Sequence, residues 1–238
     1  MTDGALKFMH IDFDRICFRY PNSTGELFSD LSLHIAAPGF HALFGPSGVG
    51  KTTLARMLSG AVSGFSGAIR TEGVRQVFYT YNLERLPGWS SVHAHLAETT
   101  PAVNRLLMEE LIAVFGIEAC VGARYNRLSM GQQNRTNLVR YLLQDFDVLI
   151  MDESLANVDE LTREKIILKI KALFPERCFL YISHNVVEVA RFCSQILILR
   201  GVSKTPQVVS VQGTDLTEEV VPIPERLERV MLEIVHAA

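Results

Sequence analysis

The segment from Gly45 to Thr52 has the residue types and the spacing needed to hold phosphate. It reads GPSGVGKT and fits the pattern G-x-x-x-x-G-K-[ST]. Glycines let backbone N–H groups turn toward phosphate oxygens, and a helix that begins near Gly50 directs its positive end at the same anion. Lys51 supplies a cation for the β- and γ-phosphates of a nucleoside triphosphate, and the Thr52 hydroxyl reaches Mg²⁺. The predicted contacts are Gly45, Pro46, Ser47, Gly48, Val49, Gly50, Lys51, Thr52 and Thr53.

A chance match in a glycine-rich turn is the alternative interpretation of this segment. Residues 39–45 are apolar enough for a short strand, and the residues after Gly50 have the apolar spacing of a helix. The motif requires a strand before it and a helix after it. This context favours the phosphate site over the chance match.

Two carboxylates, Asp152 and Glu153, follow an apolar strand that begins at Val148. In open α/β sheets, ligands bind outside the carboxyl ends of the strands. Asp152 is therefore predicted to hold Mg²⁺, and Glu153 to act as the general base that activates water. Two acids that merely cap a strand are the alternative. Their place roughly a hundred residues after a phosphate loop favours the functional interpretation.

His184 follows another apolar strand, which reads FLYIS. A lone histidine is more often structural or exposed. At the end of a core strand beside a nucleotide site, however, its side chain could contact the γ-phosphate and orient the attacking water.

Strands and helices that alternate along the chain position these residues. Residues 11–20 and 27–35 each alternate apolar and polar side chains around a PNSTG turn, which predicts an N-terminal antiparallel β hairpin. The later alternation of strand and helix predicts right-handed crossovers and a mostly parallel sheet. Residues 90–123 have apolar side chains at helical spacing, which predicts an inserted α-helical segment. The predicted fold class is α/β.

Composition excludes several classes of protein. The 238 residues are 48% hydrophobic with a net charge of −3, which argues against a nucleic-acid partner. No apolar run approaches the ~20 residues that span a bilayer, and no secretory leader is visible, so membrane association is expected through a partner. The four cysteines form no CxxC pair, which indicates neither a metal site nor a disulfide framework.

The order of motifs resembles the ATP-binding-cassette (ABC) family, specifically the nucleotide-binding subunit of a transporter. Residues 128–132 read LSMGQ and look like the family signature LSGGQ, and residues 154–159 are similar to its D-loop. His184 falls where the family has its switch histidine. Tyr20 falls where the family has an aromatic residue that stacks on adenine. The resemblance covers residues 11–200.

The resemblance implies a P-loop NTPase core with an inserted helical subdomain. We expect one ABC ATPase domain over residues 1–238. Its ATP-binding core takes residues 1–85 and 146–238, and its helical subdomain takes residues 86–145. From about Pro222 the tail is predicted to form an amphipathic helix.

The resemblance also implies ATP and Mg²⁺ as cofactors and a head-to-tail homodimer with ATP at its interface. The residues expected to contact ATP across that interface are Ser129, Gly131, Gln132 and Asp159. The implied partners are integral membrane permease subunits and an extracytoplasmic solute-binding protein, with no nucleic acid. The implied location is the cytoplasmic face of the membrane, where the chain would be peripheral through the permease.

Two residues depart from the family pattern. Met130 replaces the first glycine of the signature, where its side chain would crowd the partner's phosphates. Tyr79 holds the position of a glutamine that helps bind Mg²⁺, and Gln76 lies three residues earlier, inside the expected strand. The resemblance therefore does not extend to magnesium binding by this loop. Hydrolysis is still predicted from the intact set Lys51, Asp152, Glu153 and His184.

The stretch LPGW, residues 86–89, loosely resembles ATPase subunits of the nitrate, sulfonate and taurine importer group. An energising subunit of a membrane importer is thus the leading hypothesis. Two alternatives remain open at this point. One is a soluble cassette ATPase in cofactor assembly, and the other is a degenerate cassette that binds ATP for a regulatory purpose.

Overall fold

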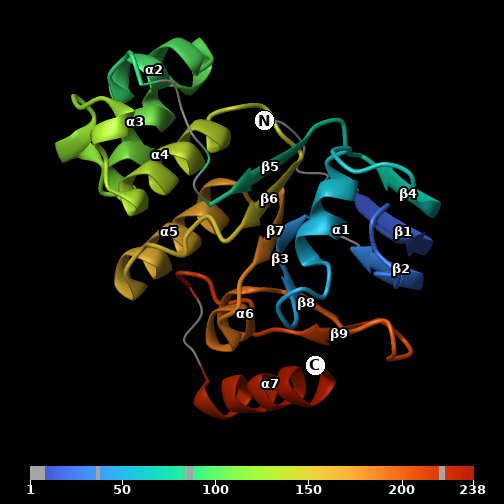
Figure 1. The fold of residues 1–238 in the computed structure, drawn as a ribbon. Helices are drawn as coiled ribbons and strands as arrows, with labels where there is room; N and C mark the ends of the chain where they lie inside the picture. Colours follow the sequence, from blue (N-terminus) through green and yellow to red (C-terminus); the bar gives the residue numbers. More distant parts are fainter. Residues whose placement is uncertain (1–8, 36–37, 83, 85–87, 220–222) are drawn as a thin grey trace.

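A six-stranded sheet forms the centre of the protein, with strand order β5-β6-β7-β3-β8-β9 (Figure 1). The computed structural model describes residues 9–35, 38–82, 84, 88–219 and 223–238. Neighbouring strands of this sheet are parallel except β9, which runs antiparallel to β8. The strands are β3 (Gly39–Phe44), β5 (Val77–Tyr81), β6 (Val148–Asp152), β7 (Cys178–Ile182), β8 (Gln195–Leu199) and β9 (Val208–Gln212).

A second, antiparallel sheet contains β1 (His10–Phe18), β2 (Phe28–Ile35) and β4 (Ser66–Glu72), in the order β2-β1-β4. The predicted N-terminal hairpin is confirmed as the pair β1–β2. A third strand, β4, extends it by pairing with β1. Helix α1 (Lys51–Leu58) lies between this sheet and the central one (Figure 1), which places the predicted phosphate loop where the two sheets meet.

Apolar side chains fill both faces of the central sheet. On β6, Val148 and Ile150 belong to the core that also buries α1 and the second sheet. Leu149 and Met151 point the other way, into a core shared with α4, α5 and α6. Side chains alternate between faces along a strand, and a parallel strand covered on both faces therefore reads as a continuous apolar run.

The helices form two groups (Figure 1). Helices α2, α3 and α4 gather at one end of the molecule, while α5, α6 and α7 lie nearer the central sheet. The α-helices after α1 are α2 (Val92–Thr99), α3 (Arg105–Val114), α4 (Met130–Leu142), α5 (Glu160–Leu173), α6 (Val186–Phe192) and α7 (Pro224–Ala237). Short 3₁₀ turns in the described residues cover Ala102–Asn104, Glu118–Cys120 and Tyr125–Arg127. No helix in the described part of the chain has both the length and the apolar character needed to cross a bilayer.

The predicted α/β class with a mostly parallel sheet is confirmed. Strand β9 was not predicted. Gln76 precedes β5, which begins at Val77, so the expectation that Gln76 lies inside the strand was wrong. Pro222 and two residues of the LPGW stretch, Leu86 and Pro87, lie outside the described residues.

Candidate functional site

The predicted phosphate loop connects β3 to α1, and its glycines are held in backbone conformations that other residues rarely adopt. Gly45 has φ 144°, and a Cβ there would lie 2.2 Å from the carbonyl oxygen of Leu199 on β8. Gly50 has φ 108°, and a Cβ there would lie 2.7 Å from the ring of Phe28 on β2. Residues of both sheets therefore pack closely against the loop, and only glycine fits at Gly45 and Gly50.

Lys51 is folded into the loop that precedes it. Its Nζ donates to the carbonyl oxygens of Gly45 and Pro46, each at 2.8 Å, and the residue is only 7% exposed. Burial lowers the pKa of Lys51, while the carboxylates of Asp152 and Glu153 oppose that shift. The chain thus keeps a buried cation beside two acids, at the point where the loop's N–H groups would meet an anion.

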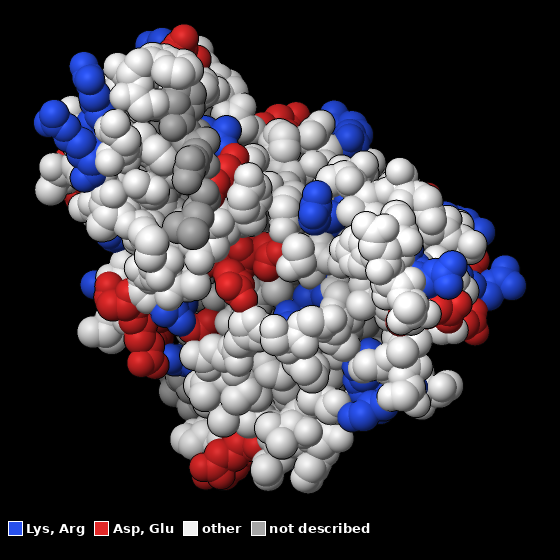
Figure 2. Space-filling model, viewed as in Figure 1, with Lys and Arg blue, Asp and Glu red and all other residues white. Residues whose placement is uncertain are grey.

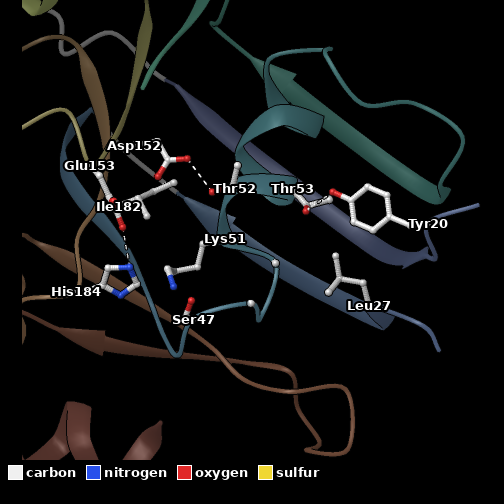
Figure 3. Close-up of a pocket in the computed structure, with 12 residues that line it drawn as sticks. Tyr20, Leu27, Ser47, Lys51, Thr52, Thr53, Asp152, Glu153, Ile182 and His184 are labelled. Atoms are coloured by element: carbon white, nitrogen blue, oxygen red, sulfur yellow. Dashed lines mark hydrogen bonds and ion pairs between the residues drawn. The ribbon is translucent and has the colours of Figure 1, made fainter. Parts of the chain in front are cut away.

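The carboxylate of Asp152, at the end of β6, accepts hydrogen bonds from two neighbouring elements. Its Oδ2 accepts from the Thr52 hydroxyl at 2.8 Å, a bond drawn in Figure 3. The same oxygen accepts from the Tyr79 hydroxyl at 2.7 Å. Burial and the bond to Asp152 raise the pKa of Tyr79, so its phenol stays protonated and acts as a donor.

Glu153 and His184 face one another across the ends of β6 and β7 (Figure 3). His184 Nε2 lies 2.7 Å from Glu153 Oε1. The backbone of Glu153 has φ 52°, a left-handed conformation that costs a residue other than glycine about 1–3 kcal/mol. Such strain is concentrated at functional sites, because the surrounding structure must hold it in place.

These side chains share one cavity of about 240 Å³. Figure 2 shows a hollow near the centre of this face, where acidic and basic side chains lie close together. The Tyr20 hydroxyl and the Thr53 hydroxyl share a hydrogen bond of 2.8 Å at its far side (Figure 3). The residues that line the cavity are Tyr20, Leu27, Ser47, Gly48, Gly50, Lys51, Thr52, Thr53, Asp152, Glu153, Ile182 and His184.

Most of the predicted site residues therefore come together. Three residues of the loop, Gly45, Pro46 and Val49, build it without lining the cavity. Leu27 and Ile182 line the cavity but were not predicted, because an apolar side chain on a strand gives no signal of its own in the sequence. In the sequence, Tyr79 was singled out only because it departs from the family pattern, and no role was predicted for its side chain. Its bond to Asp152 follows from the pairing of β5 with β6.

The residues predicted to act across a dimer lie apart from this cavity. Ser129 caps α4: its hydroxyl accepts from Gln132 N, and the Gln132 side chain accepts from Ser129 N. A Cβ on Gly131 would lie 2.4 Å from the carbonyl oxygen of Asn157. Asp159 caps α5, and a hydrogen bond from Thr162 N lowers the pKa of its carboxyl group. The dimer contacts themselves stay predictions.

Met130 begins α4 and is 52% exposed. Its side chain thus lies at the surface beside Ser129. The sequence predicts that it would crowd the phosphates of ATP bound by a second copy of the chain.

A glycine-rich loop between a central strand and a helix, facing a strand that ends in two acids, defines a P-loop nucleotide-binding fold. A family model described as "ABC transporter" matches residues 28–156. The chain belongs to the ABC transporter family, which confirms the resemblance found in the motifs.

Several curated relatives carry the name of molybdenum import ATP-binding protein ModC. The protein from Mesorhizobium japonicum is 34% identical over 211 residues, which are 79% of this chain and 56% of that protein. ModC 2 from Bradyrhizobium diazoefficiens is 32% identical over 202 residues, which are 78% of this chain and 22% of that protein. The chain thus spans about half the length of these relatives, or less. The narrower resemblance to nitrate, sulfonate and taurine importers stays a prediction.

Among solved structures, a bacterial Atm1-family ABC exporter with ATP bound superposes with a TM-score of 0.76. The match covers 97% of this chain and 42% of that one, at 20% sequence identity. At this identity the likeness supports the fold alone.

Proposed function

We propose that this chain is the ATP-binding and ATP-hydrolysing subunit of a membrane importer of the ABC class. The observation that carries the proposal is the convergence of a buried lysine, a hydroxyl, two carboxylates and a histidine in one cavity. The names of the relatives, which describe import ATP-binding proteins, support the direction of transport. They also make molybdenum import the first case to test.

The site suits Mg²⁺ bound together with a nucleotide. Magnesium is held in proteins by one or two carboxylates plus substrate phosphates and waters rather than by a complete cage of side chains. Within the described residues no group of three or more His, Cys, Asp or Glu side chains is arranged to hold a metal. Thr52 and Asp152 supply hydroxyl and carboxylate oxygens that already lie 2.8 Å apart. When bound, the cation neutralises charge on the phosphates.

Each residue of the site then has a separate role. Lys51 exchanges its bonds to the loop carbonyls for phosphate oxygens, which is favourable because its charge is already desolvated. Glu153 accepts a proton from the attacking water. His184, which contacts the Glu153 carboxylate, orients that carboxylate and the water toward the γ-phosphate. Tyr20 offers its ring for adenine at the other end of the cavity.

The remaining partners follow from the same family membership. A second copy of the chain would contribute Ser129, Gly131, Gln132 and Asp159 to each ATP. Permease subunits would hold the pair at the cytoplasmic face of the membrane, and a solute-binding protein would deliver cargo on the far side. The segment 86–145 would be the helical subdomain that docks on the permease.

Phosphate release by the complex with its permease tests the proposal. The complex is used because the permease would hold the two copies of the chain together. Wild type should release phosphate, and Glu153→Gln should lower the rate by about 100-fold or more, since a general base contributes 10²–10⁴-fold. Glu228→Gln, on the exposed face of α7, is the matched control and should keep the wild-type rate. Equal, negligible rates from wild type and Glu153→Gln would favour a binding-only regulatory cassette instead.

A further inference from the structure

Among the described residues, both side chains that donate to the Asp152 carboxylate bind the same oxygen. Its Oδ2 accepts both the Thr52 hydroxyl of α1 and the Tyr79 hydroxyl of β5, at 2.8 and 2.7 Å. A carboxylate oxygen offers two lone-pair sites, so these two bonds fill Oδ2. Oδ1 is thereby left as the oxygen that can face a cation or its waters.

The two donors differ in what else they do. Thr52 lines the cavity and is itself a predicted magnesium ligand, so its hydroxyl must serve both the cation and Asp152. Tyr79 does not line the cavity. Its bond to Asp152 is therefore the one that can remain unchanged when Thr52 turns toward a cation.

Tyr79 is also held rigidly. Strand β5 pairs with β6 in a parallel register that sets Tyr79 opposite Ile150 and Tyr81 opposite Asp152. The Tyr79 ring stacks on the Tyr81 ring, with centroids 5.7 Å apart and 23° between the planes. Tyr79 also packs against the core under α1. A phenol fixed in this way holds its partner with little loss of side-chain entropy.

We propose that Tyr79 is the positioning residue of the magnesium site, acting through the Asp152 carboxylate. This inference rests on the proposed function. It assigns a role to Tyr79, which the sequence analysis matched to the family's glutamine but which lies inside β5 rather than after it. Its phenol would orient the carboxylate instead of contacting the cation. Partners that orient a metal-binding carboxylate typically change metal affinity by 10–100-fold when they are removed.

The test compares Tyr79→Phe with Tyr81→Phe. Both variants lose one phenolic oxygen from the same strand, but only Tyr79 donates to Asp152, while Tyr81 is 46% exposed. The probe is Mn²⁺ with ADP, titrated on the purified protein and followed by electron paramagnetic resonance. Tyr79→Phe should weaken Mn²⁺ binding by about 10-fold or more, whereas Tyr81→Phe should stay within about 2-fold of wild type.

A second titration, of ADP in EDTA, separates positioning from general damage. Positioning predicts that both variants bind ADP as wild type does when no divalent cation is present. Mn²⁺ affinity of Tyr79→Phe within 2-fold of wild type would overturn the inference. An equal loss of ADP affinity in EDTA would overturn it too, because the tyrosine would then be merely structural. If wild type itself bound no Mn²⁺ with ADP, the proposed function would fail rather than this refinement of it.

Discussion

Replacing Gly131 by alanine tests whether the signature segment is packed as tightly against the loop after β6 as the structure shows. An alanine Cβ at this position would lie 2.4 Å from the Asn157 carbonyl oxygen, whereas ordinary contacts begin at 3.4 Å. The backbone of one segment would have to move by about 1 Å, and overpacking of this kind costs about 1–3 kcal/mol. Alanine in place of glycine stabilises a helix interior by about 1 kcal/mol, and Gly131, the second residue of α4, would gain at most that amount. The free energy of unfolding is therefore expected to fall by about 1 kcal/mol in Gly131→Ala. A fall supports the close contact with Asn157, and a rise contradicts it.

Gly122→Ala is the control, since nothing lies within 4 Å of a Cβ there and no unusual φ is involved. It should leave the protein unchanged or stabilise it by up to about 1 kcal/mol. Urea unfolding measures both free energies, and thermal unfolding should place Gly131→Ala about 2–4 °C below wild type. If Gly131→Ala were as stable as Gly122→Ala, the contact with Asn157 would not exist as described. The same shift moves the segment that leads to Asp159, so ATP hydrolysis by the complex should fall as well.

Three further predictions follow from single contacts. Tyr20→Phe keeps the aromatic ring and loses only the hydrogen bond to Thr53, so its affinity for ATP should equal that of wild type. Tyr20→Ala also loses the ring, and a base–aromatic stack contributes about 1–3 kcal/mol. Titration calorimetry should therefore show about 5–150-fold weaker ATP binding for Tyr20→Ala. Arg163→Ala leaves the buried carboxylate of Glu188 without its cation and should cost about 3 kcal/mol in urea unfolding, and a smaller loss than 1 kcal/mol would contradict the pairing. Burial and a hydrogen bond to the Glu84 carboxylate raise the pKa of Tyr141 to about 12, above its value near 10 in the unfolded chain. As pH rises from 10 to 12, the unfolded chain therefore loses this proton while the folded protein keeps it. The free energy of unfolding should fall over that range. Tyr141→Phe should make that decline shallower, and an unchanged slope would count against the shift.

Local chemistry explains why the strand, the glycine-rich turn and the helix around residues 45–52 could be predicted. These residues are consecutive, and a strand, a glycine-rich turn and a helix each leave their own periodicity in the sequence. The acidic pair at the end of β6 was predictable for the same reason, since a run of apolar residues ends abruptly in Asp152 and Glu153. The continuous burial of β6 and β7 explains the apolar runs that indicated a parallel sheet.

Features that depend on pairing between distant segments could not be predicted. The bond from Tyr79 to Asp152 requires the register of β5 against β6, which no local pattern encodes. The left-handed backbone of Glu153 is imposed by its surroundings rather than by its side chain. Strand β9 is short, lies at the edge of the sheet and follows a turn-rich stretch, so its five residues gave too weak a signal.

Equilibrium binding of ATP to wild type and Lys51→Ala, in the presence of Mg²⁺, tests the central claim most directly. A charged hydrogen bond contributes about 1.5–3 kcal/mol, so Lys51→Ala should bind ATP about 10–150-fold more weakly. Lys165→Ala, an exposed lysine on α5, is the matched control and should bind as wild type does. Circular dichroism of both variants establishes that they are folded. Equal ATP affinities for wild type and a folded Lys51→Ala would contradict the assignment of the loop between β3 and α1 as the phosphate site.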